Sequence, residues 1–390
     1  MTTTPEFGLG PWQLDPPDPL TLVVVGISAD SCAQADDIAS RIKGASVIES
    51  HAPSPDDGVT WLASLNVNGM AAPLLCWPEV IDANDIDLST SSDPQQSLVV
   101  QTLLDPDDPL TCLCQLLKLL VLIDDQSGGI LDAETGRWLE RDIIMRDLVD
   151  EEIEPNEDLL WMVTAESQED GHLIRTSGLR RSGHAELQIE NIRDDQVDAA
   201  ASLMGSIAGL CMESILPEHG TVIEIGPGLN LRVMSASDEN GQAVASFESA
   251  GETSITAILD HLQTGMAAIY QTQRSTERLR LLAQSSWATF LKLIPLATER
   301  GGACYVEVTF EDPEGEEYRR EHLWMSVERC DDDGVIAIPA QEAMIAEGIA
   351  QEPCLIRSNE IANWTIVIDE DTWGPEQCAA LKDLLNEGNA

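Results

Sequence analysis

The order of short apolar stretches in the first part of the chain restricts its fold more than any other feature. The stretch LTLVVVGI at 20–27 is typical of a buried strand, and residues 28–44 have the pattern of a helix with Ser28 as its N-cap. Residues 58–77 alternate apolar and polar side chains around Asn68-Gly69, a dipeptide that favours a hairpin turn. This part of the chain is therefore predicted as strand, helix and two strands.

The succession of predicted strands and helices continues to residue 150. We predict a strand at 97–104, a helix at 107–119, and strands at 119–124 (LLVLID) and 128–135 (GGILDAET). The order β-α-β-β followed by β-α-β is that of a ferredoxin-like α+β unit. A ferredoxin-like domain is therefore expected over 20–150, after a proline-rich lead-in at 1–19 that can be neither helix nor central strand.

A chain of 390 residues is long enough for two or three domains. The acidic run DEEIEPNED at 150–158 is predicted as a linker. It would separate the first domain from a middle α+β domain at 158–270, with a strand, turn and strand followed by a long helix. In a C-terminal α+β domain at 274–390, a helix at 275–294 precedes a small, hairpin-rich sheet that packs on it. The predicted fold class is therefore α+β throughout.

The chain is strongly acidic, and its charge excludes two classes of partner. It has 69 acidic and 21 basic residues, which gives a net charge of −48. Such a charge repels phosphate backbones and anionic lipid surfaces, so neither a nucleic acid nor a membrane is expected as a partner. The charge has two interpretations. It keeps the protein soluble, or it favours partners that carry positive charge.

Several patterns point away from export, membrane insertion and bound metals. The start, MTTTPEFGLG, has neither a charged nor an apolar signal region, and the longest apolar run (112–123) is too short to cross a bilayer. The nine cysteines show no zinc-ligand spacing and suggest reduced, buried thiols. The six histidines form no H-x-H or H-E-x-x-H pattern. We expect a cytoplasmic protein without a metal or cofactor.

The segment TVIEIGPGLN at 221–230 resembles the glycine-rich motif of S-adenosylmethionine-dependent methyltransferases. In that motif a helix begins directly after the glycines, because its N-terminus and the close backbone approach hold the ligand. Here Asn230 stands where a third glycine is expected, and the residues that follow read as strand, turn and strand. A tight turn at Gly226 and Gly228 therefore accounts better for this segment.

The richest group of polar side chains lies in RTSGLRRSGHAELQIE at 175–190. Arg175, Arg181 and Glu186 could bind an anion or perform acid–base chemistry at a sheet edge. The same alternation is equally expected of a half-exposed strand with cross-strand ion pairs. Both interpretations stay open at this point.

Two segments resemble bacterial domain families of unknown function. FEDPEGEEYRREHLWMSV and NEIANWTIVID make residues 274–390 similar to domain of unknown function 2314. TSGLRRSGHAELQIE and the Gly-Arg-Trp at 136–138 make the preceding part similar to domain of unknown function 4026. Where the second family has His and Phe, this chain has Ser177 and Ser182. The resemblance implies an architecture and no mechanism.

EHLWMSV at 321–327 is predicted as one strand. Alternation puts His322, Trp324 and Ser326 on one face and Leu323, Met325 and Val327 on the other, with both faces at least half covered. His322 is then either a hydrogen-bonded structural residue or, with Glu321 and Trp324, a contact for a ligand. The prediction for the whole chain is a small-molecule or protein binding module without catalytic activity. The alternative is a hydrolase or transferase that uses the region from Arg175 to Glu186.

Overall fold

The structure, a computed structural model, divides the chain into two compact units, Met1–Thr272 and Gln273–Ala390. It describes residues 12–28, 32–51, 59–81, 95–149, 153–214, 216–238, 240–251, 254–264, 269–311, 320–331, 334–340, 353–369 and 371–387. Helices and sheets occur in both units, so the predicted α+β class is confirmed. The first unit holds two sheets, and its division at 150–158 into two domains stays a prediction.

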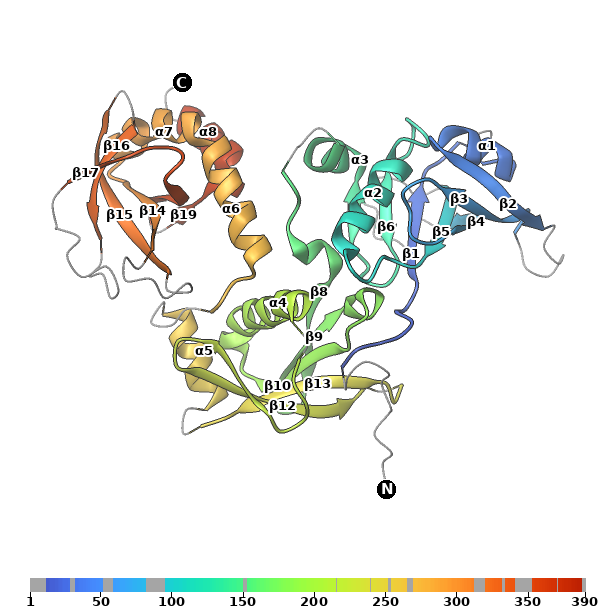
Figure 1. Cartoon of the computed structure of the whole chain (residues 1–390), viewed down its shortest axis with the longest axis horizontal. Coiled ribbons are helices and arrows are strands. Elements are labelled where there is room, and N and C mark those ends of the chain that lie inside the picture. Colours follow the sequence, from blue (N-terminus) through green and yellow to red (C-terminus); the bar gives the residue numbers. More distant parts are fainter. Residues whose placement is uncertain are drawn as a thin grey trace. The chain divides into compact units, whose positions relative to one another are not determined.

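The first sheet of this unit has seven strands in the order β2-β3-β4-β5-β1-β6-β7. Their bounds are β1 Leu20–Val25, β2 Ala45–His51, β3 Leu62–Val67, β4 Leu74–Ile81, β5 Gln95–Thr102, β6 Gly129–Asp132 and β7 Trp138–Glu140. β1 is antiparallel to both β5 and β6. The central order β4-β5-β1-β6 is the ferredoxin-like arrangement predicted from the sequence. The β2–β3 hairpin (Figure 1) extends it on one side. β7 extends it on the other.

Helix α1 (Ala35–Arg41) follows β1, and helix α2 (Pro109–Val121) connects β5 to β6. α2 begins at Pro109, close to the predicted start at 107, and the Asp108 side chain caps it by accepting a hydrogen bond from the Thr111 amide at 3.3 Å. A short helix α3 (Arg141–Ile144) and a π-helical turn, Met145–Val149, follow β7. Apolar side chains of α2, among them Leu113 and Leu117, are buried in the core of this unit.

Two predictions for this sheet are wrong. The strand expected at 119–124 does not form, because α2 continues to Val121; periodicity does not separate a short buried helix from a buried strand. Ser28 does not cap α1, which begins at Ala35. Instead the amide and hydroxyl of Ser28 both donate to Asp124 Oδ2, at 2.9 and 2.7 Å, in a contact between distant segments.

The second sheet of the first unit has six strands in the order β11-β12-β13-β10-β9-β8. Its elements are the 3₁₀ turn η2 Glu157–Leu160, β8 Met162–Gln168, β9 Gly171–Ser177, the turn η3 Leu179–Ser182, β10 Glu186–Ile192, the turn η4 Asp194–Gln196, α4 Val197–Glu213, β11 Val222–Gly226, β12 Leu229–Ser237, β13 Ala243–Ser249 and α5 Ile255–Gln263. β10 and β13 run parallel, since α4 leads the chain away from β10 before β11 begins. α4 packs on β8, β9 and β10 with a stripe of buried apolar side chains.

The second unit is one six-stranded antiparallel sheet with helices on one face (Figure 1). Its strand order is β17-β16-β15-β14-β18-β19. The bounds are α6 Gln273–Ser285, α7 Trp287–Glu299, β14 Ala303–Glu311, β15 Arg320–Asp331, β16 Gly334–Pro339, β17 Cys354–Ile356, β18 Ile361–Ile368, β19 Asp371–Trp373, the turn η5 Pro375–Gln377 and α8 Cys378–Glu387. Phe290 and Trp364 stack at 4.9 Å in the core between helices and sheet. The predicted small sheet packed on a helix is confirmed.

The single helix expected at 275–294 is two helices, α6 and α7, which meet at Ser286. The Ser286 hydroxyl donates to the Leu282 carbonyl oxygen at 2.6 Å and accepts from Trp364 Nε1 at 2.9 Å. A serine that bonds back to the preceding turn competes with the helical hydrogen bonds and bends the helix. The same hydroxyl links the junction of the two helices to a tryptophan that is 78 residues away in the chain.

Candidate functional site

Arg181 is completely buried in the first unit, and its guanidinium donates hydrogen bonds to two different segments. Nη1 donates to Asp132 Oδ2 at 2.6 Å, and Nε and Nη2 donate to the Leu160 carbonyl oxygen at 3.1 and 2.8 Å. Asp132 lies in β6 of the first sheet, whereas Arg181 lies in η3 beside the second sheet. The side chain predicted to bind a ligand thus joins the two sheets of this unit.

Glu186 organises the turn between β9 and β10. Its Oε2 accepts from Thr176 Oγ1 at 2.6 Å, and its Oε1 accepts from the amides of Gly178 and Arg180 at 2.9 and 3.2 Å. Burial raises the pKa of the Glu186 carboxyl, and these three hydrogen bonds oppose that rise. Glu186 serves as an acceptor for a glycine-bearing turn, a role that the alternation of the strand does not reveal.

Arg175 forms an ion pair with Asp238. Its Nη2 donates to Asp238 Oδ2 at 3.1 Å, and Asp238 Oδ1 accepts from the amides of Asn240 and Gln242, at 2.9 and 2.7 Å. The pair ties β9 to the turn after β12. Arg175, Arg181 and Glu186 each bind a different partner, and a ligand shared by them would have to break these bonds.

A hollow of about 700 Å³ lies in the first unit where the β8–β9 hairpin approaches the start of α4. His172 and Asp194 line it and form a pair, with His172 Nε2 at 2.7 Å from Asp194 Oδ1. Asp194 is 96% exposed, so the carboxylate is solvated. Within the described part of the chain, no group of three or more His, Cys, Asp or Glu side chains could hold a metal ion.

The glycine-rich segment at 221–230 is a hairpin. β11 ends at Gly226 and β12 begins at Leu229, and these two residues pair in an antiparallel ladder. Gly228 has a φ of +74°, a conformation that glycine adopts without strain. A second strand follows where a cofactor-binding motif has a helix, so the turn interpretation of this segment is the one the structure supports.

β15 alternates as predicted. Leu323 and Met325 are fully buried against the helices, while Trp324 is half-buried on the opposite, outer face of the sheet. His322 shares that face; its side chain is 36% exposed, with Nδ1 3.5 Å from Glu307 Oε1. The backbone of Glu321 pairs with that of Phe310 in β14, and the Glu321 side chain lies outside the described part of the structure.

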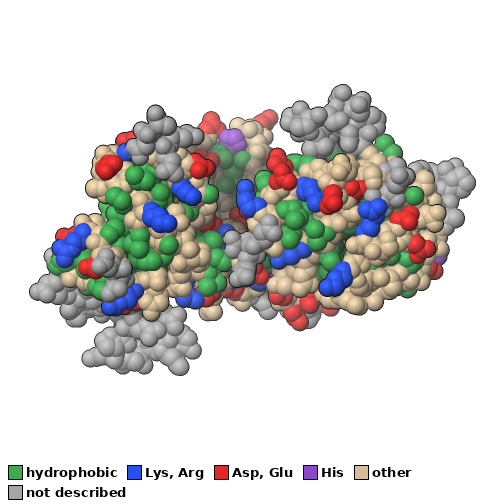
Figure 2. All heavy atoms as spheres, turned by 90° about the horizontal axis from the view of Figure 1, so that it is seen from above, with side chains coloured by type: hydrophobic (Ala, Val, Ile, Leu, Met, Phe, Trp, Pro, Cys, Tyr) green, Lys and Arg blue, Asp and Glu red, His purple; other side chains and the backbone are tan. Residues whose placement is uncertain are grey.

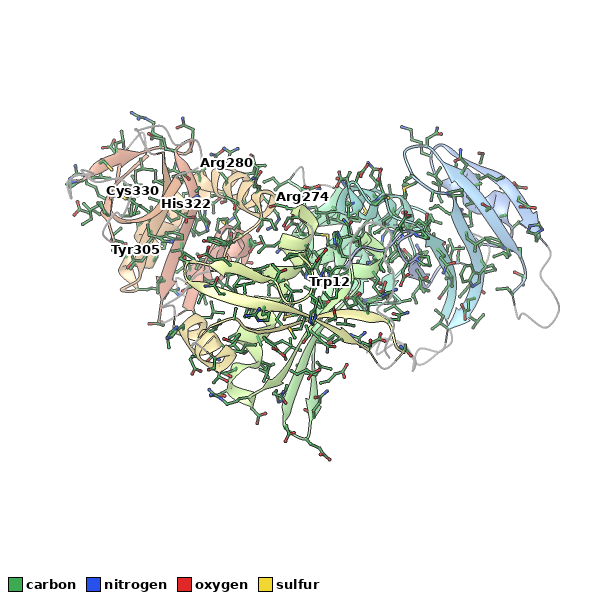
Figure 3. The ribbon with its side chains drawn as sticks, turned by 60° about the horizontal axis from the view of Figure 1, so that its bottom comes forward. Trp12, Arg274, Arg280, Tyr305, His322 and Cys330 are labelled. Carbon is green, nitrogen blue, oxygen red and sulfur yellow. The ribbon has the colours of Figure 1, made fainter. Side chains whose placement is uncertain are left out.

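The outer face of this sheet contains a pocket of about 550 Å³. Two aromatic side chains line it, Tyr305 from β14 and Trp324 from β15 (Figure 3 labels Tyr305 and His322 on the sheet). The other lining residues are Ala340, Asn363, Trp364, Thr365, Val367, Thr372, Gly374 and Gln377. The register explains how they meet, because Tyr305 pairs with Ser326 on one side and Thr365 on the other.

Two amide side chains of this pocket have a determined orientation. Asn363 Oδ1 accepts from the Trp364 amide at 2.8 Å, and Gln377 Oε1 accepts from the Gly374 amide at 2.9 Å. A backbone N–H can donate only to the oxygen of such a side chain, which leaves its NH₂ group on the other side. Neither NH₂ group has an acceptor among the described residues. Both are therefore available to a ligand.

Of the predicted candidates in this unit whose side chains the structure describes, Trp324 lines the pocket, and His322 lies on the same face of the sheet. Sequence reasoning missed Tyr305, Asn363, Thr365 and Gln377. The alternation of ACYVEVTF at 303–310 could have placed Tyr305 on an outer face. Gln377 lies in a turn after β19, and no sequence pattern links it to β14 or β15.

Comparison with known proteins identifies no relative. The chain matches no protein-family model, no curated protein and no solved structure. Its resemblance to the two families of unknown function therefore stays a prediction. Among the helices in the described ranges, none is both long and apolar enough to span a bilayer.

Proposed function

We propose that this protein is a binding protein without catalytic activity, and that its second unit holds a small molecule in the outer-face pocket defined by Tyr305, Trp324, Asn363, Thr365 and Gln377. The observation that carries the proposal is the pocket itself, which combines two aromatic side chains with available polar groups. Its volume of about 550 Å³ lies in the range of small-molecule sites, about 300–1,000 Å³.

The position of the pocket on a rigid scaffold supports this function. Its residues come from β14, β15, β18, β19 and η5, and the opposite face of the sheet is fixed by the Phe290–Trp364 core. A site supplied by neighbouring strands of one sheet loses little entropy when a ligand binds. The alternative, a hydrolase or transferase centred on Arg175 and Glu186, would first have to break the buried bonds of those side chains.

The acidic charge and the cysteines support a cytoplasmic, soluble protein that does not bind nucleic acid. On the face drawn in Figure 2, acidic, basic and hydrophobic side chains are interspersed, with no continuous basic surface. Six cysteines are buried and none of the nine is in a disulfide. Burial raises the pKa of Cys76 and Cys211 to about 12, which keeps these thiols protonated and unreactive.

Thermal unfolding of the full chain against a library of metabolites tests this function. A ligand at a hundredfold excess over its Kd stabilises the folded state by about 2.7 kcal/mol. We expect a rise in the unfolding midpoint that disappears in Trp324→Ala and persists in Trp77→Ala, a half-buried tryptophan of the first unit. A library without any hit, or a hit that Trp324→Ala leaves unchanged, would overturn the proposal.

A further inference from the structure

The pocket on the outer face of the second unit selects an uncharged ligand. We propose that this ligand is a neutral saccharide, a mono- or disaccharide whose ring packs on Tyr305 and Trp324. The inference rests on the proposed binding function and names the chemical class of its ligand. Three features of the pocket carry it: its lack of charge, its hydrogen-bonding groups and its aromatic side chains.

All described residues that line the pocket are uncharged. An anion would find neither arginine nor lysine there, and the net charge of −48 repels it from the whole chain. A cation would need a carboxylate in the pocket. Glu307, which pairs with both Trp324 and Asn363, is not among the lining residues; its side chain is 20% exposed, and its Oε1 lies 3.5 Å from His322 Nδ1. The lining therefore favours a ligand without formal charge.

The polar groups of the pocket suit hydroxyl groups. The NH₂ groups of Asn363 and Gln377 are donors, because their oxygens already accept backbone hydrogen bonds. The Thr365 hydroxyl donates to the Trp373 carbonyl oxygen at 3.1 Å, so its remaining lone pairs can only accept. A ligand must accept at the first two positions and donate at the third. A sugar hydroxyl does both.

Tyr305 and Trp324 supply the surface that binds the ring. Both are half-buried, and an aromatic side chain combines an apolar face with one polar group at its edge. Sugar rings have the complementary form, an apolar C–H face surrounded by hydroxyl groups. The polar lining residues come from three elements, β18, β19 and η5. A ring that carries hydroxyl groups around its edge offers a partner to the polar groups of each element.

Isothermal titration calorimetry on the full chain tests the inference with named probes. The panel contains glucose, galactose, mannose, N-acetylglucosamine, maltose and cellobiose as neutral sugars, with adenosine, choline and citrate as other chemical classes. We expect at least one sugar to bind and the three other probes to show no heat of binding. Sugar binding should be lost in Trp324→Ala.

Two nearly isosteric variants test the hydrogen-bonding argument. Asn363→Asp and Gln377→Glu keep the oxygen that accepts the backbone amide and replace the NH₂ donor by a second oxygen. Each should weaken sugar binding at least tenfold. Asn359→Asp adds the same charge at an exposed turn of the second unit and should change the affinity less than twofold.

The outcomes separate the two proposals. If adenosine, choline or citrate binds at the pocket and no sugar does, the ligand class is wrong and the binding function stands. If sugars bind but both donor variants bind them as tightly as the unmodified chain, the inference from the amide groups is overturned. If no probe binds and the metabolite library also gives no hit, both proposals fail.

Discussion

Replacement of Arg181 by methionine should lower the free energy of unfolding of the first unit by about 3–5 kcal/mol, the usual cost of removing one partner of a buried ion pair. Methionine fills much of the same volume but has no donor. Asp132, whose side chain is 5% exposed, then loses the donor at Oδ2, while its Oδ1 keeps the amides of Glu134 and Thr135, at 3.2 and 3.4 Å. The Leu160 carbonyl oxygen also loses two bonds.

Urea unfolding, followed by tryptophan fluorescence and far-UV circular dichroism, measures this loss. The chain has two units, so the free energy is taken from the transition that the substitution shifts. Asp132→Asn added to Arg181→Met removes the buried charge and keeps an oxygen for the two amides. It should restore about 1–3 kcal/mol, the cost of an unsatisfied buried group.

Arg180→Met is the matched control. Arg180 pairs with Asp18, which is 41% exposed, so its loss should cost about 1 kcal/mol or less, as for solvent-screened pairs. If Arg181→Met costs no more than this control, the buried pair contributes no more to stability than a solvent-screened one. If the second substitution, Asp132→Asn, restores nothing, the unpaired carboxylate is not the cause of the loss.

Three further predictions concern single positions. Gly178→Ala should destabilise the first unit more than Gly220→Ala in the same urea assay. Both glycines have a positive φ, +109° and +83°. A Cβ at Gly178 would lie 2.6 Å from a backbone oxygen, whereas a Cβ at Gly220 would have none of the described atoms within 4 Å. Equal losses of stability in the two variants would contradict this prediction. Because burial raises the pKa of Glu186 above its ordinary 4.5, the folded state holds this proton more tightly than the unfolded chain. Its contribution to the free energy of unfolding is complete below about pH 4.5 and is lost as the pH rises through the pKa of the folded state. Glu186→Gln should therefore reduce the slope of the free energy of unfolding against pH in that range. An unchanged slope would refute this prediction. Iodoacetamide should modify exposed Cys330 in the native protein and leave Cys76, with a pKa of about 12, unmodified until urea is added, as peptide mass spectrometry would show.

The predictability of this fold differs from element to element for physical reasons. The strand β15 was assigned to its two faces correctly, since a period of two leaves only one way to bury Leu323 and Met325 together. The C-terminal end of α2 was predicted incorrectly, because the segment LLVLI can be buried equally well as a helix or as a strand. The elements that pack on it decide between the two. α6 and α7 meet at Ser286, whose hydroxyl accepts a hydrogen bond from Trp364, a contact that local patterns do not contain.

The candidate site was less predictable than the fold. Arg175, Arg181 and Glu186 were selected as polar residue types that perform chemistry, yet each is engaged by a group on a distant or turning segment. A sequence shows which side chains are charged and gives no sign of which partner already holds them. Trp324 was correctly placed on the outer face, but its neighbours in the pocket were not found.

The sequence by itself determined the α+β class, the ferredoxin-like order of the first strands, the acidic charge and the alternation of β15, because these depend on local periodicity and composition. Only the tertiary structure decided which side chains meet. Tyr305, Asn363 and Gln377 line one pocket because β14 pairs with β15 and β18, and β18 with β19. Strand pairing joins segments as distant in the chain as Ala303 and Val367 by backbone hydrogen bonds that any residue can make, so it leaves little trace in the residues themselves.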